Sequence, residues 1–130
     1  MAKSIVQSFK VATTLSAYRF VAVSAQGTVA YPANNQTLPI GVTLDDVNDT
    51  TGGIPVAMVG SIAKLYFNDT VSAAGLVSSD SSGRGVPFTL ANTTTALTLA
   101  SAYGGILEGA AVAATGTIAN IVVMPGFDRE

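Results

Sequence analysis

The stretch Phe20-Val-Ala-Val-Ser-Ala-Gln-Gly-Thr-Val-Ala-Tyr-Pro32 contains the clearest structural signal in this chain. Two runs rich in Val, Ala and aromatic residues, Tyr18–Val23 and Thr28–Tyr31, flank the four residues Ser24–Gly27. β-branched and aromatic residues favour strands, and Gly27 can adopt the positive φ that a tight turn requires. The stretch therefore predicts a β-hairpin.

The same pattern continues along the chain, where short apolar runs end at Gly, Pro, Asn or Asp. Only Thr94–Ala102 has a weak helical periodicity. Several short strands at this spacing predict a mainly β fold, a small β-barrel or sandwich of short antiparallel strands with at most one or two short helices. The further strands that we expect are Leu38–Leu44, Ile54–Val59, Ser61–Phe67, Leu76–Ser79, Gly85–Leu90, Ile106–Glu108 and Ile118–Met124.

Two parts of the chain, residues 20–60 and 76–126, resemble one another. The second part is longer by about eight residues, which fall within Phe88–Tyr103. The likeness indicates two similar β units packed in one domain, although hairpins with glycine turns also resemble one another by chance. The matched pairs are Val21 with Val77, Gly27 with Gly83, and Gly41 with Gly105.

The N-terminal residues differ from the rest, because their apolar and polar side chains alternate without a neighbouring strand to pair with. We expect an extended N-terminal arm over residues 1–17 and a single β-rich domain over residues 18–130. The arm would pair either within its own domain or with another protein by strand addition. Its apolar residues include Ile5, Val6, Phe9 and Val11.

The composition excludes many chemical functions. Of the 130 residues, 48% are apolar and 11% are charged, against about 25% charged in an average protein. The chain has no Cys and no His, which excludes disulfides, thiolate zinc sites and Ser–His–Asp catalysis. Six scattered Lys and Arg residues give no footprint for nucleic acid, and no stretch is apolar enough to predict a membrane span. We therefore expect no enzyme, no catalytic residues and no cofactor.

The densest acidic cluster is Asp45-Asp46-Val47-Asn48-Asp49. A calcium-binding EF-hand that started at Asp45 would need Gly and Glu where Thr50 and Val56 stand. The cluster is more typical of a solvated loop whose side chains cap turns, so we expect no metal. Glu108, which follows an apolar run, is expected to form a structural ion pair with Lys64 or Arg84.

Three segments resemble the head-decoration, or capsid cement, proteins of tailed bacteriophages. They are Pro39-Ile-Gly-Val-Thr-Leu-Asp-Asp, Gly53-Ile-Pro-Val-Ala-Met-Val-Gly-Ser-Ile-Ala-Lys and Asp69-Thr-Val-Ser-Ala-Ala-Gly-Leu-Val-Ser-Ser-Asp-Ser-Ser-Gly-Arg-Gly. The resemblance covers most of Tyr18–Met124 and rests on patterns of glycine and apolar residues.

This resemblance implies a protein on the outer surface of the mature capsid in the virion. It also implies homotrimers at three-fold and quasi-three-fold positions that bridge subunits of the major capsid protein. The arm would be the docking strand, with Ile5, Val6, Phe9 and Val11 as its candidate partner-binding residues. The alternative is another virion β-module, a tail, baseplate or spike component that binds a receptor or glycan. Five Phe and four Tyr, spread singly along the chain, argue against a sugar-binding aromatic cluster.

Overall fold

The computed structural model describes residues 5–11, 13–24, 27–33, 37–46, 53–88, 101–109 and 116–128. The fold is mainly β, as predicted, with ten strands and no α-helix among the described residues. None of these residues belongs to a helix long and apolar enough to cross a membrane. The weak helical segment Thr94–Ala102 lies outside the described residues except for its last two, which begin a strand.

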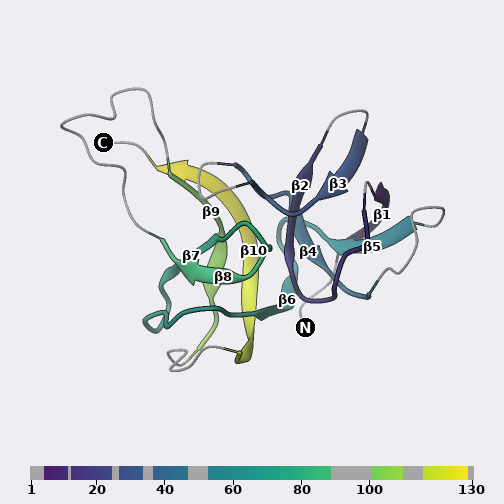
Figure 1. The fold of residues 1–130 in the computed structure, drawn as a ribbon. Helices are drawn as coiled ribbons and strands as arrows, with labels where there is room; N and C mark the ends of the chain where they lie inside the picture. Colours follow the sequence, from purple (N-terminus) through teal and green to yellow (C-terminus); the bar gives the residue numbers. More distant parts are fainter. Residues whose placement is uncertain are drawn as a thin grey trace, which may run out of the picture.

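The first half of the chain forms a closed five-stranded barrel (Figure 1). Its strand order is β1-β3-β2-β4-β5, and β1 closes the barrel by pairing with β5 on one side and β3 on the other. The barrel encloses a core of Val11, Leu15, Val21, Val29, Ile54 and Val56. The strands are β1 (Val6–Val11), β2 (Phe20–Val23), β3 (Thr28–Ala30), β4 (Gly41–Thr43) and β5 (Gly53–Ala57).

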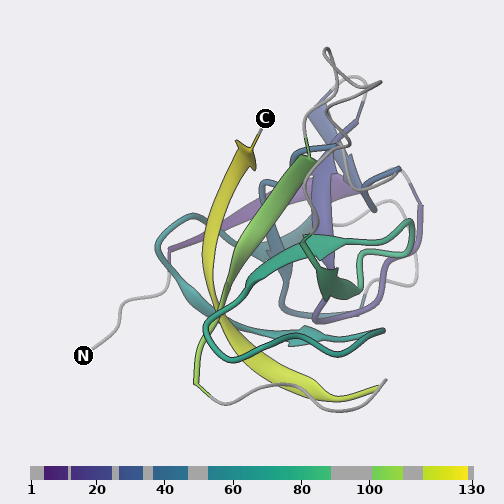
Figure 2. The same ribbon diagram turned by 90° about the vertical axis from the view of Figure 1, so that its left-hand side faces the viewer.

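The second half forms a five-stranded sheet in the order β6-β10-β9-β7-β8. A parallel bridge between Phe67 and Gly85 brings its two outer strands together. Figure 2 shows how the longest strand, β10, curves through the whole of this half. The strands are β6 (Ile62–Tyr66), β7 (Leu76–Ser79), β8 (Gly85–Pro87), β9 (Ser101–Leu107) and β10 (Ile118–Asp128).

The two halves have the same strand order when β1–β5 are matched with β6–β10. The registers also correspond. Val21 lies opposite Gly41 and Val77 opposite Gly105, and the parallel pair Val11–Val29 corresponds to Phe67–Gly85. Both hairpins turn at a glycine with positive φ, 78° at Gly27 and 75° at Gly83. The topology of the second half therefore repeats that of the first, along the residue pairs that the sequence likeness matches.

One glycine in each half sits where no side chain fits. A Cβ placed on Gly41 would lie 2.2 Å from the carbonyl oxygen of Ala57, and a Cβ on Gly105 would lie 2.4 Å from that of Val122. The close approach of two backbones is a typical reason for glycine inside a strand. The two glycines therefore allow the same tight crossing of neighbouring strands in both halves.

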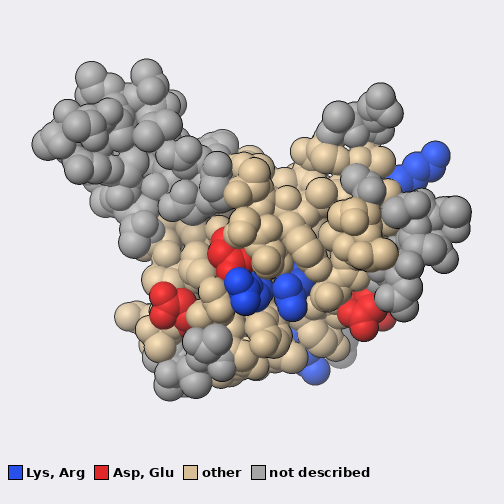
Figure 3. All heavy atoms as spheres, viewed as in Figure 1, with Lys and Arg blue, Asp and Glu red and all other residues tan. Residues whose placement is uncertain are grey.

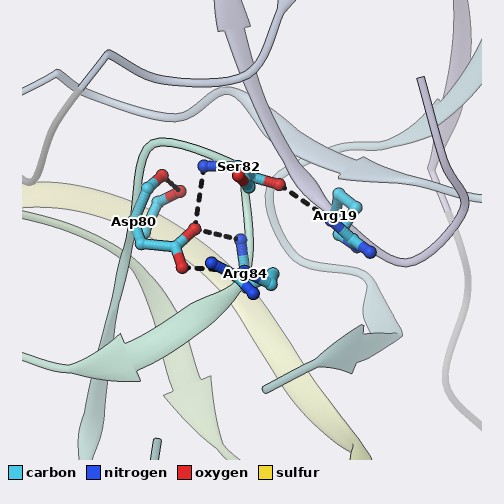
Figure 4. A network of polar contacts seen from close by, with 5 residues as sticks. Arg19, Asp80, Ser82 and Arg84 are labelled. Atoms are coloured by element: carbon cyan, nitrogen blue, oxygen red, sulfur yellow. Dashed lines mark hydrogen bonds and ion pairs between the residues drawn. The ribbon is translucent and has the colours of Figure 1, made fainter. Parts of the chain in front are cut away.

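The halves share a common core rather than standing apart. Phe20, Val42 and Ala57 come from barrel strands but pack with the core of the second half. The ring of Phe20 lies so close to Gly104 that an added Cβ there would be 2.3 Å from its Cε1. A polar contact also crosses the boundary, because Arg19 Nη1 donates a hydrogen bond to the carbonyl oxygen of Ser82 at 3.0 Å (Figure 4).

The structure corrects the expectation of a separate arm. Val6–Val11 is strand β1 of the barrel, antiparallel to β5 from Val6 to Lys10 and parallel to β3 at Lys10 and Val11. Its partners were not visible in the sequence because β5 follows it by more than 40 residues. Of the two alternatives left open for the arm, pairing within its own domain is the one that the structure contains.

Candidate docking surface

Exposed large apolar side chains gather where the two halves meet. The segment Met58–Ser61 joins β5 to β6, and it is contacted by the residue that precedes β1 and by β10. A cluster of exposed apolar residues on a monomer is typical of an interaction site. We call these residues the junction patch; they are Ile5, Val6, Val59 and Met124, with 55%, 48%, 56% and 40% of their surfaces exposed.

A buried serine holds the junction patch in place. Ser61 is fully buried, and its Oγ accepts a hydrogen bond from the Ile5 backbone N–H at 2.7 Å. The Ile5 carbonyl oxygen in turn accepts hydrogen bonds from Met58 N–H at 2.7 Å and from Ser61 Oγ at 3.1 Å. On the other side, Gly60 N–H donates to the carbonyl oxygen of Val123, the neighbour of Met124, at 2.8 Å. The exposed side chains therefore stand on an ordered backbone.

Strand β1 adds an open edge to this surface. One edge of β1 pairs with β5 along its length, whereas the other pairs with β3 only at Lys10 and Val11. Within the described part of the chain, Val6–Phe9 has no strand partner on that second edge. An unpaired strand edge presents backbone donors and acceptors to which another strand can add.

The four residues predicted to bind a partner divide into two pairs. Ile5 and Val6 are exposed and belong to the junction patch. Val11 is buried in the barrel core and Phe9 packs against that core, so their side chains stabilise the barrel itself. A partner role for Ile5 and Val6 stays a prediction. Val59 and Met124 were not predicted, because only the tertiary structure joins the Met58–Ser61 segment to Ile5 and to β10.

Charged side chains are few in this chain, and one group of them forms an ion pair. On the face shown in Figure 3, blue and red side chains lie together near the middle of a described surface that is otherwise mostly uncharged. Among the described residues one ion pair forms, between Arg84 Nε and Asp80 Oδ2 at 2.9 Å. The expected pairing of Glu108 with Lys64 or Arg84 is therefore wrong: Asp80 holds Arg84, and Glu108 is exposed on the far end of β9.

The acidic segment at residues 45–49 is described only at its first two positions. The Oδ1 of Asp46 accepts a hydrogen bond from Ala17 N–H at 2.7 Å, so this carboxylate holds the segment before β2. In the described part of the chain, no three acidic side chains come together as metal ligands would.

Aromatic residues that are separate in the sequence gather around Arg19. Its guanidinium carbon lies 4.8 Å from the ring centre of Tyr66 and 6.0 Å from that of Tyr31. Tyr18 precedes Arg19 and is joined to β6, because its carbonyl oxygen accepts a hydrogen bond from Tyr66 N–H at 2.8 Å. Tyr31 and Tyr66, which stand singly in the sequence, thus come together in space at Arg19. No local sequence signal marked them, since they belong to different strands and loops.

The described residues thus form an all-β protein of two similar units with an apolar surface at their junction. No family model matches the sequence, and no curated protein sequence matches it. Among solved structures, the chain resembles the N base of the head fiber protein gp8.5 of bacteriophage phi29. The TM-score is 0.66 at 16% sequence identity, over 94% of this chain and 95% of that chain. At that identity, the likeness establishes a shared fold.

Proposed function

We propose that this protein is a structural component of a bacteriophage head, bound to the outer surface of the mature capsid. The observation that carries the proposal is the fold shared with a phage head fiber base over nearly the whole of both chains. The resemblance of three segments to capsid decoration proteins points in the same direction. Binding and bridging need complementary area rather than reactive groups, which suits a chain without His or Cys.

In this proposal the major capsid protein covers the junction patch and the open edge of β1. Ile5 and Val6 are exposed at the start of β1, beside its unpaired edge, and backbone hydrogen bonds link Ile5 to the segment that carries Val59 and link that segment to β10 next to Met124. Apolar burial would supply affinity, and backbone pairing along Val6–Phe9 would set the orientation. Trimers at three-fold positions would place three such surfaces on neighbouring subunits and stabilise the assembled shell by mass action.

The test is binding of the purified full-length chain to mature capsids that lack it, followed by electron cryomicroscopy. We expect density on the outer capsid surface at three-fold and quasi-three-fold positions, with β1 facing the shell. Capsids with bound protein should also withstand a higher temperature before they release DNA. Absence of binding, or density on the tail instead, would contradict the proposal, and the second result would favour a receptor-binding tail or baseplate component.

Paired variants identify the surface that docks. Ile5→Asp and Val59→Asp place charge in the junction patch and should weaken capsid binding by about tenfold or more, since buried charge without a partner is costly. Val23→Asp is the matched control, because Val23 is as exposed as Val59, at 56%, but lies on β2 outside the patch. Equal loss of binding in all three variants would exclude the junction patch as the specific docking surface.

A further inference from the structure

A pocket lined by polar as well as apolar residues, unlike the apolar junction patch, lies where the segment before β2 passes over the outer face of the second half. It has a volume of about 490 Å³ and is lined by Tyr18, Lys64, Ile118, Ala119 and Asn120. Tyr18 comes from the first half, whereas the other four residues lie on β6 and β10. The pocket therefore exists only because the two halves pack together.

Tyr18, which lines this pocket, has a strained backbone. Its φ is 62°, a left-handed conformation that residues with a side chain adopt at a cost in free energy. Hydrogen bonds hold the conformation on both sides, from Tyr18 N–H to the Thr43 carbonyl oxygen at 2.9 Å and from Tyr66 N–H to the Tyr18 carbonyl oxygen at 2.8 Å. Backbone strain that the surrounding structure maintains is found preferentially at ligand sites.

The wall beside Tyr18 is rigid as well. Arg19, the next residue, stacks its guanidinium 4.8 Å from the ring centre of Tyr66. Tyr66 lies two positions from Lys64 on β6 and opposite Ile118 on β10. Stacking of a cation on an aromatic ring stabilises both groups. Arg19 and Tyr66 do not line the pocket, but their stacking supports the neighbouring lining residues Tyr18 and Lys64, and a site supported in this way pays a lower entropic cost on binding a ligand.

A row of three polar side chains crosses the sheet at the pocket. Asn120 on β10 lies opposite Lys64 on β6, and its carbonyl oxygen accepts a hydrogen bond from Glu108 N–H, at the end of β9, at 3.0 Å. Residues opposite one another in antiparallel strands project from the same face. All three residues are exposed, and within the described residues none of their side chains forms a hydrogen bond or ion pair.

We propose that this pocket binds a neutral saccharide unit. The Tyr18 ring and the exposed Ile118 side chain offer apolar surface to the C–H face of a sugar ring. In the lining, Lys64 supplies donors and the Asn120 amide supplies both donors and acceptors, which matches hydroxyl groups that donate and accept. Glu108 does not line the pocket but lies beside Asn120, where its negative charge offsets that of Lys64, so the row favours a ligand without net charge. This inference does not depend on attachment to a capsid.

The test uses the full-length chain and three neutral probes that differ in linkage and substituents: maltotetraose, cellotetraose and the tetramer of N-acetylglucosamine. Saturation-transfer NMR detects binding and calorimetry measures Kd. We expect saturable binding of at least one probe, weakened about tenfold by Tyr18→Ala and about fivefold by Asn120→Ala. Tyr18→Phe, which keeps the ring, should bind nearly as well as the unmodified chain.

Control variants and a charged probe complete the experiment. Lys10→Gln removes an exposed lysine from β1, away from the pocket, and should leave Kd unchanged, whereas Lys64→Gln should weaken binding. If Tyr18→Ala does not fold, the Kd values of the exposed strand variants Asn120→Ala and Lys64→Gln test the proposal instead. Failure of all three neutral probes at millimolar concentration, binding unchanged in the pocket variants, or binding confined to an acidic hyaluronan tetrasaccharide would each overturn the proposal.

Discussion

In both halves of the molecule a parallel contact links the first strand, or the residue that follows it, to the third strand. The side chains that fill the space beside this contact differ between the halves. In the first half the contact joins Val11 to Val29, and in the second half it joins Phe67 to Gly85. Val11, Val29 and Phe67 are all buried. A Cβ placed on Gly85 would lie 2.7 Å from Cδ2 of Phe67 and 2.8 Å from Cδ2 of Leu65, so the phenyl ring, together with Leu65, occupies the space that a side chain at Gly85 would need.

This difference shows what the shared topology requires. Two medium side chains have been exchanged for one large side chain and none, while strand order and register are retained. Cores tolerate such exchanges when total volume is kept. The glycines at Gly41 and Gly105, in contrast, are the same in both halves because the obstacle is a backbone oxygen, which no change of side chain can move.

The largest effect is expected from removing β1, which distinguishes a barrel strand from a detachable arm. Deletion of residues 1–11 removes Val11 and Phe9 from the core and leaves β5 paired with β4 alone. We expect cooperative unfolding in urea to be lost, which corresponds to a loss of at least about 5 kcal/mol. Phe9→Asp should lower the free energy of unfolding by about 3 kcal/mol. A truncated chain with an unchanged unfolding midpoint would show that β1 is dispensable to the fold.

The next largest effect concerns the paired glycines. Gly41→Ala and Gly105→Ala each force a Cβ against a carbonyl oxygen at 2.2 and 2.4 Å, respectively. Each should lower the free energy of unfolding by about 3 kcal/mol in urea titrations. Gly53→Ala serves as control, since its nearest contact would be 3.4 Å, and should change stability by less than about 1 kcal/mol. Tolerance of Ala in one half alone would show that the halves do not share this constraint.

A smaller effect tests the exchange at Phe67 and Gly85. Gly85→Val alone should cost about 3 kcal/mol through overpacking, and Phe67→Val alone about 2 kcal/mol through a cavity. The double variant reproduces the Val–Val pair of the first half and should recover about 1–2 kcal/mol relative to the sum of the single variants. Strict additivity in this double-mutant cycle would mean that the two side chains do not compete for one space.

The smallest effect distinguishes the two equivalent hairpin turns. Asp80 accepts hydrogen bonds from Ser82 N–H, Arg84 N–H and Arg84 Nε, each at 2.9 Å (Figure 4). At the corresponding place in the first half, Ser24 Oγ hydrogen bonds to Thr28. Asp80→Ala should cost about 1–2 kcal/mol and Ser24→Ala about 0.5 kcal/mol, as measured by thermal unfolding. The reverse order would mean that the charged turn is not the more stabilising one.

Several features of the fold could be predicted from the sequence. The hairpins at Gly27 and Gly83, both with positive φ, and most strands of the second half lie where the local pattern predicts them. β9 was underestimated: it spans Ser101–Leu107 rather than Ile106–Glu108. The underestimate arose because Gly104 and Gly105 depress strand propensity locally, while close packing against Phe20 and Val122 requires glycine there.

Fewer residues of the candidate sites could be predicted from the sequence. Ile5 and Val6 were predicted as partner-binding residues, but Val59 and Met124 were not. Their segments are joined to Ile5 by hydrogen bonds between distant residues, one between Ser61 and Ile5 and one between Gly60 and Val123. The pocket at Tyr18 was not predicted, because its lining comes from segments separated by more than 40 residues.

Local sequence patterns were sufficient to predict the class of the fold and the glycine turns of the two hairpins, and they indicated the correspondence between the halves that the strand order then showed. These depend on backbone preferences of glycine and β-branched residues, which act over a few residues. Three features became visible only in the tertiary structure. Strand β1 completes a barrel with β5 and β3, and exposed apolar residues lie in the segments that meet at the junction. Two tyrosine rings lie around the guanidinium of Arg19. These features depend on strand pairings between distant segments, whose register is set by the burial of the whole core and not by any local pattern.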